Sequence, residues 1–185
     1  EKGLSIQCLF SNLTEAEKNR VKEAEQMINS NAEEVQVNGL RTLLTVPLHA
    51  IDQCDILHRI IDFSSVAVNR ELAVIFAHEL SPAGLANDQK VYRLNFNNSQ
   101  AVHLLSKLTK YEDEEVRALT VKAVGGAFSA FLSPSLKVIT LHGLENDPSE
   151  RVREELKAAM DKIDLGAAEA GMAAWQHLAG YVHAS

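Results

Sequence analysis

Small and apolar side chains recur four times along the chain in the same helical pattern. Each copy opens with a Val and places small or apolar residues four, seven and eight positions further on, which marks one face of an α-helix. The copies begin at Val35, Val68, Val116 and Val152. A pattern that recurs in this way predicts helix pairs that stack on their neighbours, so we expect all four Val side chains to be buried.

Capping signals between these faces divide the chain into a series of helices. Thr14 with Glu17, and Asn31 with Glu34, have the spacing of capping boxes, and Pro148 stands where a first helical position is expected. The predicted helices span residues 15–29, 32–46, 48–62, 65–80, 99–111, 114–132, 134–145 and 148–163, and an Ala-rich ninth runs from about 166 to 182. No strand pattern of useful length is present, so the predicted fold class is all-α.

The spacing of the four copies indicates one inserted segment. The steps between the Val positions are 33, 48 and 36 residues, and we assign the extra length of the middle step to a turn-rich loop at 81–98. This loop carries Tyr92, Arg93 and Phe96 as candidate partner-binding residues, because Tyr and Arg are enriched at binding hot spots. The alternative is that Leu94 and Phe96 tuck under the helices and cover an exposed seam.

The last two copies resemble HEAT repeats. The stretch 113–125 has an Asp, then Val-Arg, then Ala-Val-Gly, and 147–160 has a similar arrangement. The first two copies depart from the family, because Gln36 and Asn69 stand where HEAT units usually carry Arg. At 185 residues the chain, 1–185, fits one domain. The resemblance covers about residues 14–163 and implies a right-handed α-solenoid of about four helix pairs, with the C-terminal helix as a cap.

The resemblance also implies a concave surface, lined by the second helix of each pair, that often binds other proteins. The basic residues that we assign to partner binding on this surface are Arg41, Arg70, Lys122 and Lys157. Aligned along a solenoid, they form a positive ladder that suits an acidic protein partner. For Arg117 and Arg153, the family pattern implies a structural role instead, in which Asp and Arg bond neighbouring repeats to each other.

Net charge narrows the range of partners. The chain has 18 Lys and Arg against 25 Asp and Glu, a formal net charge of −7. This balance argues against a dedicated nucleic-acid binder, whose affinity depends on clustered cations that neutralise phosphates. The longest mainly apolar stretch, 165–184, contains Glu169 and two His, so it is a poor membrane span and we expect no membrane association.

Cysteine usage and the start of the chain bear on its location. Cys8 and Cys54 are far apart in sequence, which favours a reducing, cytoplasmic environment over a disulfide framework. No signal-peptide pattern opens the chain. Residue 1 is Glu rather than Met, so a targeting segment removed before this point stays an open alternative.

Two groups of residues have the chemistry of a metal site. Cys54, His58 and Asp62 share one stripe of a predicted helix, but a mononuclear site needs further ligands from elsewhere. His78-Glu79 is similar to one His-Glu pair of the di-iron HEAT hydroxylases, which need several such pairs. We therefore expect no metal, no cofactor and no catalytic residues.

The sequence thus predicts a non-enzymatic protein-binding or scaffold module that uses its second-helix face or its inserted loop. The alternatives are HEAT-type enzymes or subunits, namely a metal-dependent hydroxylase, a DNA glycosylase-like protein or a chromophore lyase-like subunit. The C-terminal helix is interpreted as a cap on the stack, and a homodimer through Trp175 and Tyr181 is the sharper alternative.

Overall fold

The computed structural model describes residues 3–6, 12–126 and 132–173, and within these ranges every regular element is helical. The elements are α1 (Glu15–Ile28), α2 (Glu33–Leu43), α3 (Ala50–Phe63), α4 (Val66–Glu79), α5 (Pro82–Leu85), α6 (Asn98–Leu108), α7 (Glu114–Gly126), α8 (Pro134–Thr140), the 3-10 helix η1 (Leu144–Asn146) and α9 (Glu150–Lys162). Residues 165–173 are helical as well. The predicted all-α class is confirmed. None of the helices in these ranges combines the length and the apolar character that spanning a bilayer requires.

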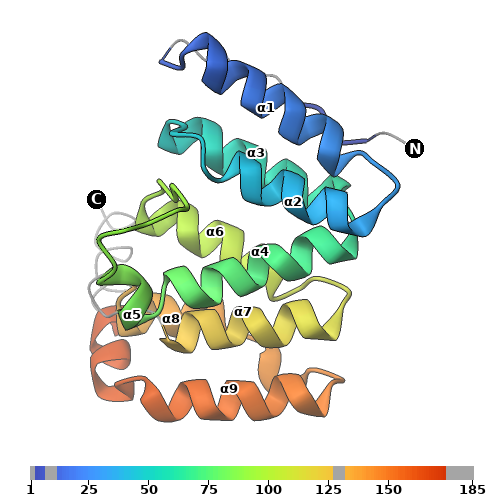
Figure 1. Cartoon of the computed structure of the whole chain (residues 1–185). Coiled ribbons are helices and arrows are strands. Elements are labelled where there is room, and N and C mark those ends of the chain that lie inside the picture. Colours follow the sequence, from blue (N-terminus) through green and yellow to red (C-terminus); the bar gives the residue numbers. More distant parts are fainter. Residues whose placement is uncertain (1–2, 7–11, 127–131, 174–185) are drawn as a thin grey trace, which may run out of the picture.

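The helices lie in two layers (Figure 1). In the front layer, α2, α4, α7 and α9 lie side by side, and each packs on the next, while α1 packs on α2 at one end. The back layer consists of α3, α6 and α8: in this view α3 lies behind α2, and α6 and α8 lie behind α4 and α7. Each predicted pair from the second onward therefore contributes one helix to each layer.

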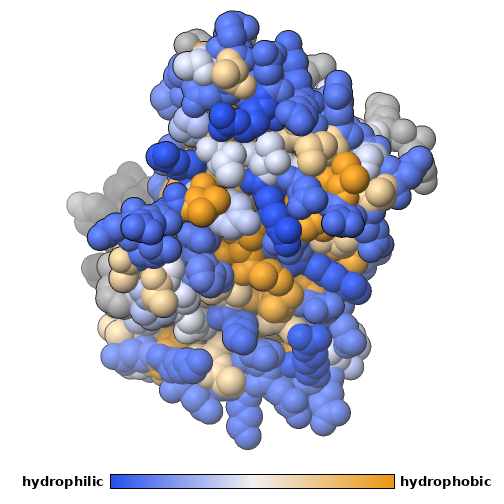
Figure 2. All heavy atoms as spheres, in the orientation of Figure 1, coloured by the Kyte–Doolittle hydropathy of each residue, from blue (hydrophilic) through white to orange (hydrophobic). Residues whose placement is uncertain are grey.

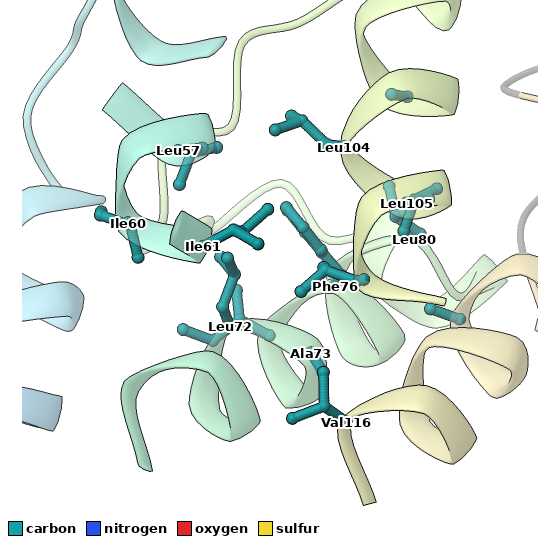
Figure 3. Close-up of a cluster of buried hydrophobic side chains, with 14 of the residues drawn as sticks. Leu57, Ile60, Ile61, Leu72, Ala73, Phe76, Leu80, Leu104, Leu105 and Val116 are labelled. Carbon is teal, nitrogen blue, oxygen red and sulfur yellow. The ribbon is translucent and has the colours of Figure 1, made fainter. Parts of the chain in front are cut away.

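The core fills the space between the layers (Figure 3). Leu57 and Ile60 of α3 meet Leu72 and Phe76 of α4, and Leu104 of α6 closes the cluster. All five side chains are almost completely buried. Leu72 and Phe76 stand four and eight positions after Val68, so the repeated pattern marks the buried face of α4.

One of the four repeat valines departs from this pattern. Val68, Val116 and Val152 are fully buried, but Val35 is 37% exposed, so the prediction for Val35 is wrong. The buried residues of α2 are Gly39, Leu40 and Leu43, whose mean direction lies about 90° around the helix from Val35 at 100° per residue. The first copy is therefore turned relative to the other three.

Two of the helix starts also differ from the sequence prediction. The capping box of Thr14 and Glu17 is present in α1. In contrast, α2 begins after Ala32 and has no side-chain cap, so the box predicted at Asn31 is wrong. Pro148 precedes the N-cap of α9 and is not its first residue, because the hydroxyl of Ser149 accepts the hydrogen bond from the N–H of Val152.

Candidate functional site

Directly after each repeat Val stands one side chain that forms hydrogen bonds. These side chains are Gln36, Asn69, Arg117 and Arg153. Each donates a hydrogen bond to a backbone carbonyl just ahead of its own helix; the acceptors are Ser30, Ser65, Tyr111 and Asp147, in that order. The two amides thus bond as the two guanidinium groups do.

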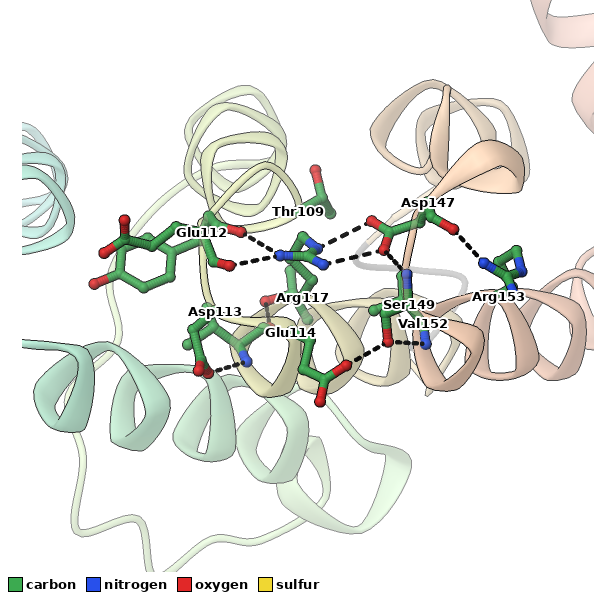
Figure 4. A network of polar contacts seen from close by, with 12 residues as sticks. Thr109, Glu112, Asp113, Glu114, Arg117, Asp147, Ser149, Val152 and Arg153 are labelled. Carbon is green, nitrogen blue, oxygen red and sulfur yellow. Dashed lines mark hydrogen bonds and ion pairs between the residues drawn. The ribbon is translucent and has the colours of Figure 1, made fainter.

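Three of these side chains also bond to the next unit of the stack. Ser65 donates its hydroxyl to the side-chain oxygen of Gln36 at 2.6 Å, and Asn69 donates to the hydroxyl of Tyr111 at 3.2 Å. Arg117 forms two hydrogen bonds with the carboxylate of Asp147, at 3.0 and 3.1 Å (Figure 4). Arg117 of α7 is therefore joined to Asp147, in the segment that leads into α9.

Among the described residues, the Arg117–Asp147 pair is the most enclosed of the ion pairs that join different helices. Its side chains are 12% and 6% exposed. Burial raises the pKa of Asp147, but hydrogen bonds from Arg117 and from the N–H of Ser149 outweigh it, so the pKa lies below its ordinary value. Backbone groups bond to both side chains as well: the guanidinium of Arg117 donates to the carbonyls of Tyr111 and Glu112, and the carboxylate of Asp147 accepts from the N–H of Ser149. The pair is therefore a structural joint rather than a ligand site.

Two of the four basic residues assigned to partner binding have acidic partners within the chain. Arg41 of α2 pairs with Glu71 of α4 at 3.0 Å. Arg70 of α4 forms a two-pronged bond with Asp113, ahead of α7, which lowers the pKa of that carboxyl. Both contacts connect neighbouring front-layer helices. They therefore join the helices, and they also neutralise part of the positive charge on the surface.

The other two candidates, Lys122 on α7 and Lys157 on α9, are exposed. Neither forms a salt bridge with any residue that the structure describes. Of the four basic residues assigned to partner binding, these two lysines are therefore the less neutralised by the chain itself. The assignment of all four stays a prediction.

We term the outward side of the front layer the front face. On this face the apolar side chain of Val74 lies on α4, between basic side chains on α2 and α7. Six residues after each repeat Val stand Arg41, Val74, Lys122 and Ala158, all of them exposed. At about 100° per residue, this position points away from the buried side of the helix. Val74 is 44% exposed, and Figure 2 shows apolar surface near the centre of this view with hydrophilic side chains around it.

The inserted segment is held against the helices. After α5, its side chains alternate: Tyr92, Leu94 and Phe96 pack against the core, whereas Val91 and Arg93 are exposed. The ring of Phe96 meets the ring of Phe76 edge-on, with centroids 5.8 Å apart. The interpretation in which Leu94 and Phe96 cover a seam thus describes their packing, and of the three loop candidates only Arg93 faces outward.

Gln53 of α3 anchors this segment, and sequence reasoning missed it. Its buried side-chain amide donates to the carbonyl of Arg93 and accepts from the N–H of Asn95, both at 2.6 Å. A neighbouring bond runs from the N–H of Arg93 to the carbonyl of Leu44. The available signal is the position of Gln53 on the apolar side of its helix, three residues before Ile56, where a polar group needs a buried partner.

The metal candidates do not converge in the described part of the chain. Asp62 pairs with Lys107 at 2.8 Å, and His58 has its pKa lowered by burial and then by the charge of Lys107. Cys54 is partly buried, and burial raises the pKa of its thiol. In the ranges that the structure describes, no three His, Cys, Asp or Glu side chains form a group that could hold a metal ion.

Three residues of the sequence analysis, Cys8, Trp175 and Tyr181, lie outside the described residues. The expected dimer contact through the C-terminal helix depends on the last two, so it stays a prediction.

Comparisons with known proteins identify no relative of this chain. No family model matches the chain, and neither the curated proteins nor the solved structures give a match.

Proposed function

We propose that this chain is a non-enzymatic protein-binding module, built as a HEAT-like stack, and that its front face binds a partner protein. The observation that carries the proposal is the exposure of Val74 at a repeated outward position, between Arg41 on α2 and Lys122 on α7. An exposed apolar surface rimmed by polar residues is typical of a protein interaction site.

Two features of the helix packing support the HEAT-like part of this proposal. The row of front-layer helices, each packed on the next, agrees with a stack of repeated units. The bond between Arg117 and Asp147 agrees with the family's Asp–Arg contact between repeats.

The charges around Val74 favour a partner segment that combines an apolar side chain with a carboxylate. Glu71 neutralises much of the charge of Arg41, so Lys122 is the stronger attraction for an acidic group. The apolar contact supplies affinity, and the charge supplies orientation and a faster encounter. The hydroxylase alternative has less support, because the described residues contain one His-Glu pair, His78–Glu79, where several are needed.

A matched pair of substitutions tests the front face. Val74→Glu places a charge in the middle of this face, and Ile139→Glu does the same on α8 of the back layer, where Ile139 is 47% exposed. We expect affinity capture with quantitative mass spectrometry to show partners that bind the wild-type chain and Ile139→Glu but not Val74→Glu.

Melting of both variants by circular dichroism near the wild-type temperature establishes that folding is unaffected. Partners retained by Val74→Glu, and lost instead when outward residues Val91 and Arg93 of the inserted segment are changed to Glu, would move recognition to that segment. Tyr92 and Phe96 are unsuitable for this comparison because they pack against the core.

A further inference from the structure

The inserted segment closes a small hollow at the C-terminal end of α4. Its volume is about 160 Å³, and its walls are formed by Glu79, Leu80, Leu85, Lys90, Tyr92, Leu94 and Phe96. We term it the α4-end pocket. A buried apolar cavity of about 150 Å³ is large enough to bind benzene. The α4-end pocket is therefore the right size for one aromatic or branched aliphatic group, and too small for most drug-sized ligands.

The walls of the α4-end pocket are fixed by packing. Gly84 brings α5 against the end of α4 so closely that a Cβ at this position would lie 2.2 Å from the carbonyl oxygen of His78. The opposite wall is held by the contact of Phe96 with Phe76 and by the two bonds from Gln53 to the inserted segment. A pocket preformed in this way spends little binding energy on ordering its walls.

Two opposite charges line the α4-end pocket without pairing with each other. The side chain of Glu79 is 12% exposed, and its salt-bridge contact within the described residues is the exposed ring of His78, at 3.3 Å. Lys90 is exposed and forms no salt bridge with Glu79. The C-terminal end of α4 adds partial negative charge, and the aromatic ring of Tyr92 also favours a cation.

From these features we infer that the α4-end pocket binds an α-ammonium group that carries an apolar side chain. The side chain fills the space between Leu80, Leu85 and the two aromatic rings, and the ammonium group pairs with Glu79. Two sources present this chemistry: a free amino acid, whose carboxylate would face Lys90, and the N-terminal residue of a polypeptide. The inference does not depend on the front face, because none of the pocket residues belongs to it.

The test measures binding of three probes by isothermal titration calorimetry or by NMR chemical-shift changes. The probes are L-phenylalanine, L-phenylalaninamide and N-acetyl-L-phenylalaninamide, which differ in the ammonium and carboxylate groups but share the ring. We expect the probes with a free ammonium group to bind, and the acetylated probe to bind at least tenfold more weakly. The comparison of phenylalanine with its amide distinguishes the sources: preference for the free acid, lost in Lys90→Gln, indicates an amino acid, and equal or better binding of the amide indicates a polypeptide N-terminus.

Variants make the assignment specific. Glu79→Gln is expected to weaken binding of the amide at least tenfold, because it removes a charge-assisted bond at a largely desolvated carboxylate. Glu154→Gln is the same substitution at an exposed carboxylate on α9, away from the pocket, and is expected to bind as the wild type does. Leu85→Phe, which fills the hollow without changing its charge, should also abolish binding. The inference is overturned if no probe binds at millimolar concentrations, if the acetylated probe binds equally well, or if Glu79→Gln has no effect.

Discussion

At the scale of single residues, burial separates two ion pairs that have the same geometry. Arg117 with Asp147 and Arg70 with Asp113 are both two-pronged bonds between neighbouring units. In the first pair the side chains are 12% and 6% exposed, and in the second they are 47% and 16% exposed. Loss of one partner leaves a buried charge in the first pair, whereas water replaces the lost contact in the second.

We therefore expect Arg117→Ala to lower the free energy of unfolding by about 3–5 kcal/mol, the range for breaking a buried pair. Arg70→Ala should lower it by no more than about 1 kcal/mol, as is usual for an exposed pair. Urea unfolding of the two variants beside the wild type measures both values. Equal losses would show that burial does not decide the strength of these joints.

The residue scale also shows where sequence reasoning ends. The role of Arg117 could be predicted, because the resemblance identifies it. Gln36 and Asn69 looked like departures from the family, yet their amides bond across to Ser65 and Tyr111. These partners could not be predicted, because the distance between side chains of different units is set by how the helices stack.

At the scale of helices, close approach depends on individual glycines. A Cβ at Gly125 of α7 would lie 2.6 Å from the Cβ of Ala159 on α9, whereas a Cβ at Gly126 would have no atom within 4 Å. The sequence marks both as small residues in a helix, and only the packing of α7 on α9 distinguishes them.

Gly125→Ala should destabilise the protein by about 1–3 kcal/mol, because the added methyl group overfills the contact between α7 and α9. Gly126→Ala should be neutral or stabilising by up to about 1 kcal/mol, since Ala is favoured over Gly in a helix. Thermal or chemical denaturation of the two neighbouring variants provides a direct comparison. A loss of stability in Gly126→Ala of the same size would mean that α7 and α9 do not approach at Gly125.

Helix positions were largely predictable, because apolar periodicity and caps are local properties of the chain. The predicted helix 134–145 is an instructive difference: it ends at Thr140, and η1 follows after Gly143, which has a φ of 87°. Few residues other than glycine adopt this backbone conformation, so Gly143 is the signal for the break. In the inserted segment, by contrast, the alternation of Tyr92 and Phe96 with outward residues depends on bonds to Gln53, which is distant in sequence.

At the scale of the whole molecule, the helices differ in how many neighbours support them. In the middle of the stack, α4 packs on α2, α3, α5 and α7, whereas α1 packs mainly on α2 at one end. Hydrogen bonds from Leu4 and Ile6 to side chains of Asn29 and Glu25 tie a short N-terminal strap to α1. A helix with one main neighbour can open while the other helices stay folded, because its opening breaks few contacts.

Hydrogen–deuterium exchange followed by mass spectrometry should therefore show a gradient along the stack. Peptides from α4 and α7 should exchange slowest, because opening these helices breaks contacts on several sides, and peptides from α1 should exchange fastest among the long helices. Deletion of residues 1–6 should speed exchange in α1, because it removes the bonds from Leu4 and Ile6 to Asn29 and Glu25. Exchange in α4 should stay unchanged, because these bonds do not reach α4. Equal protection of α1 and α4 in the wild-type chain would mean that the molecule opens as a single cooperative unit, and would contradict a stack of separately supported pairs.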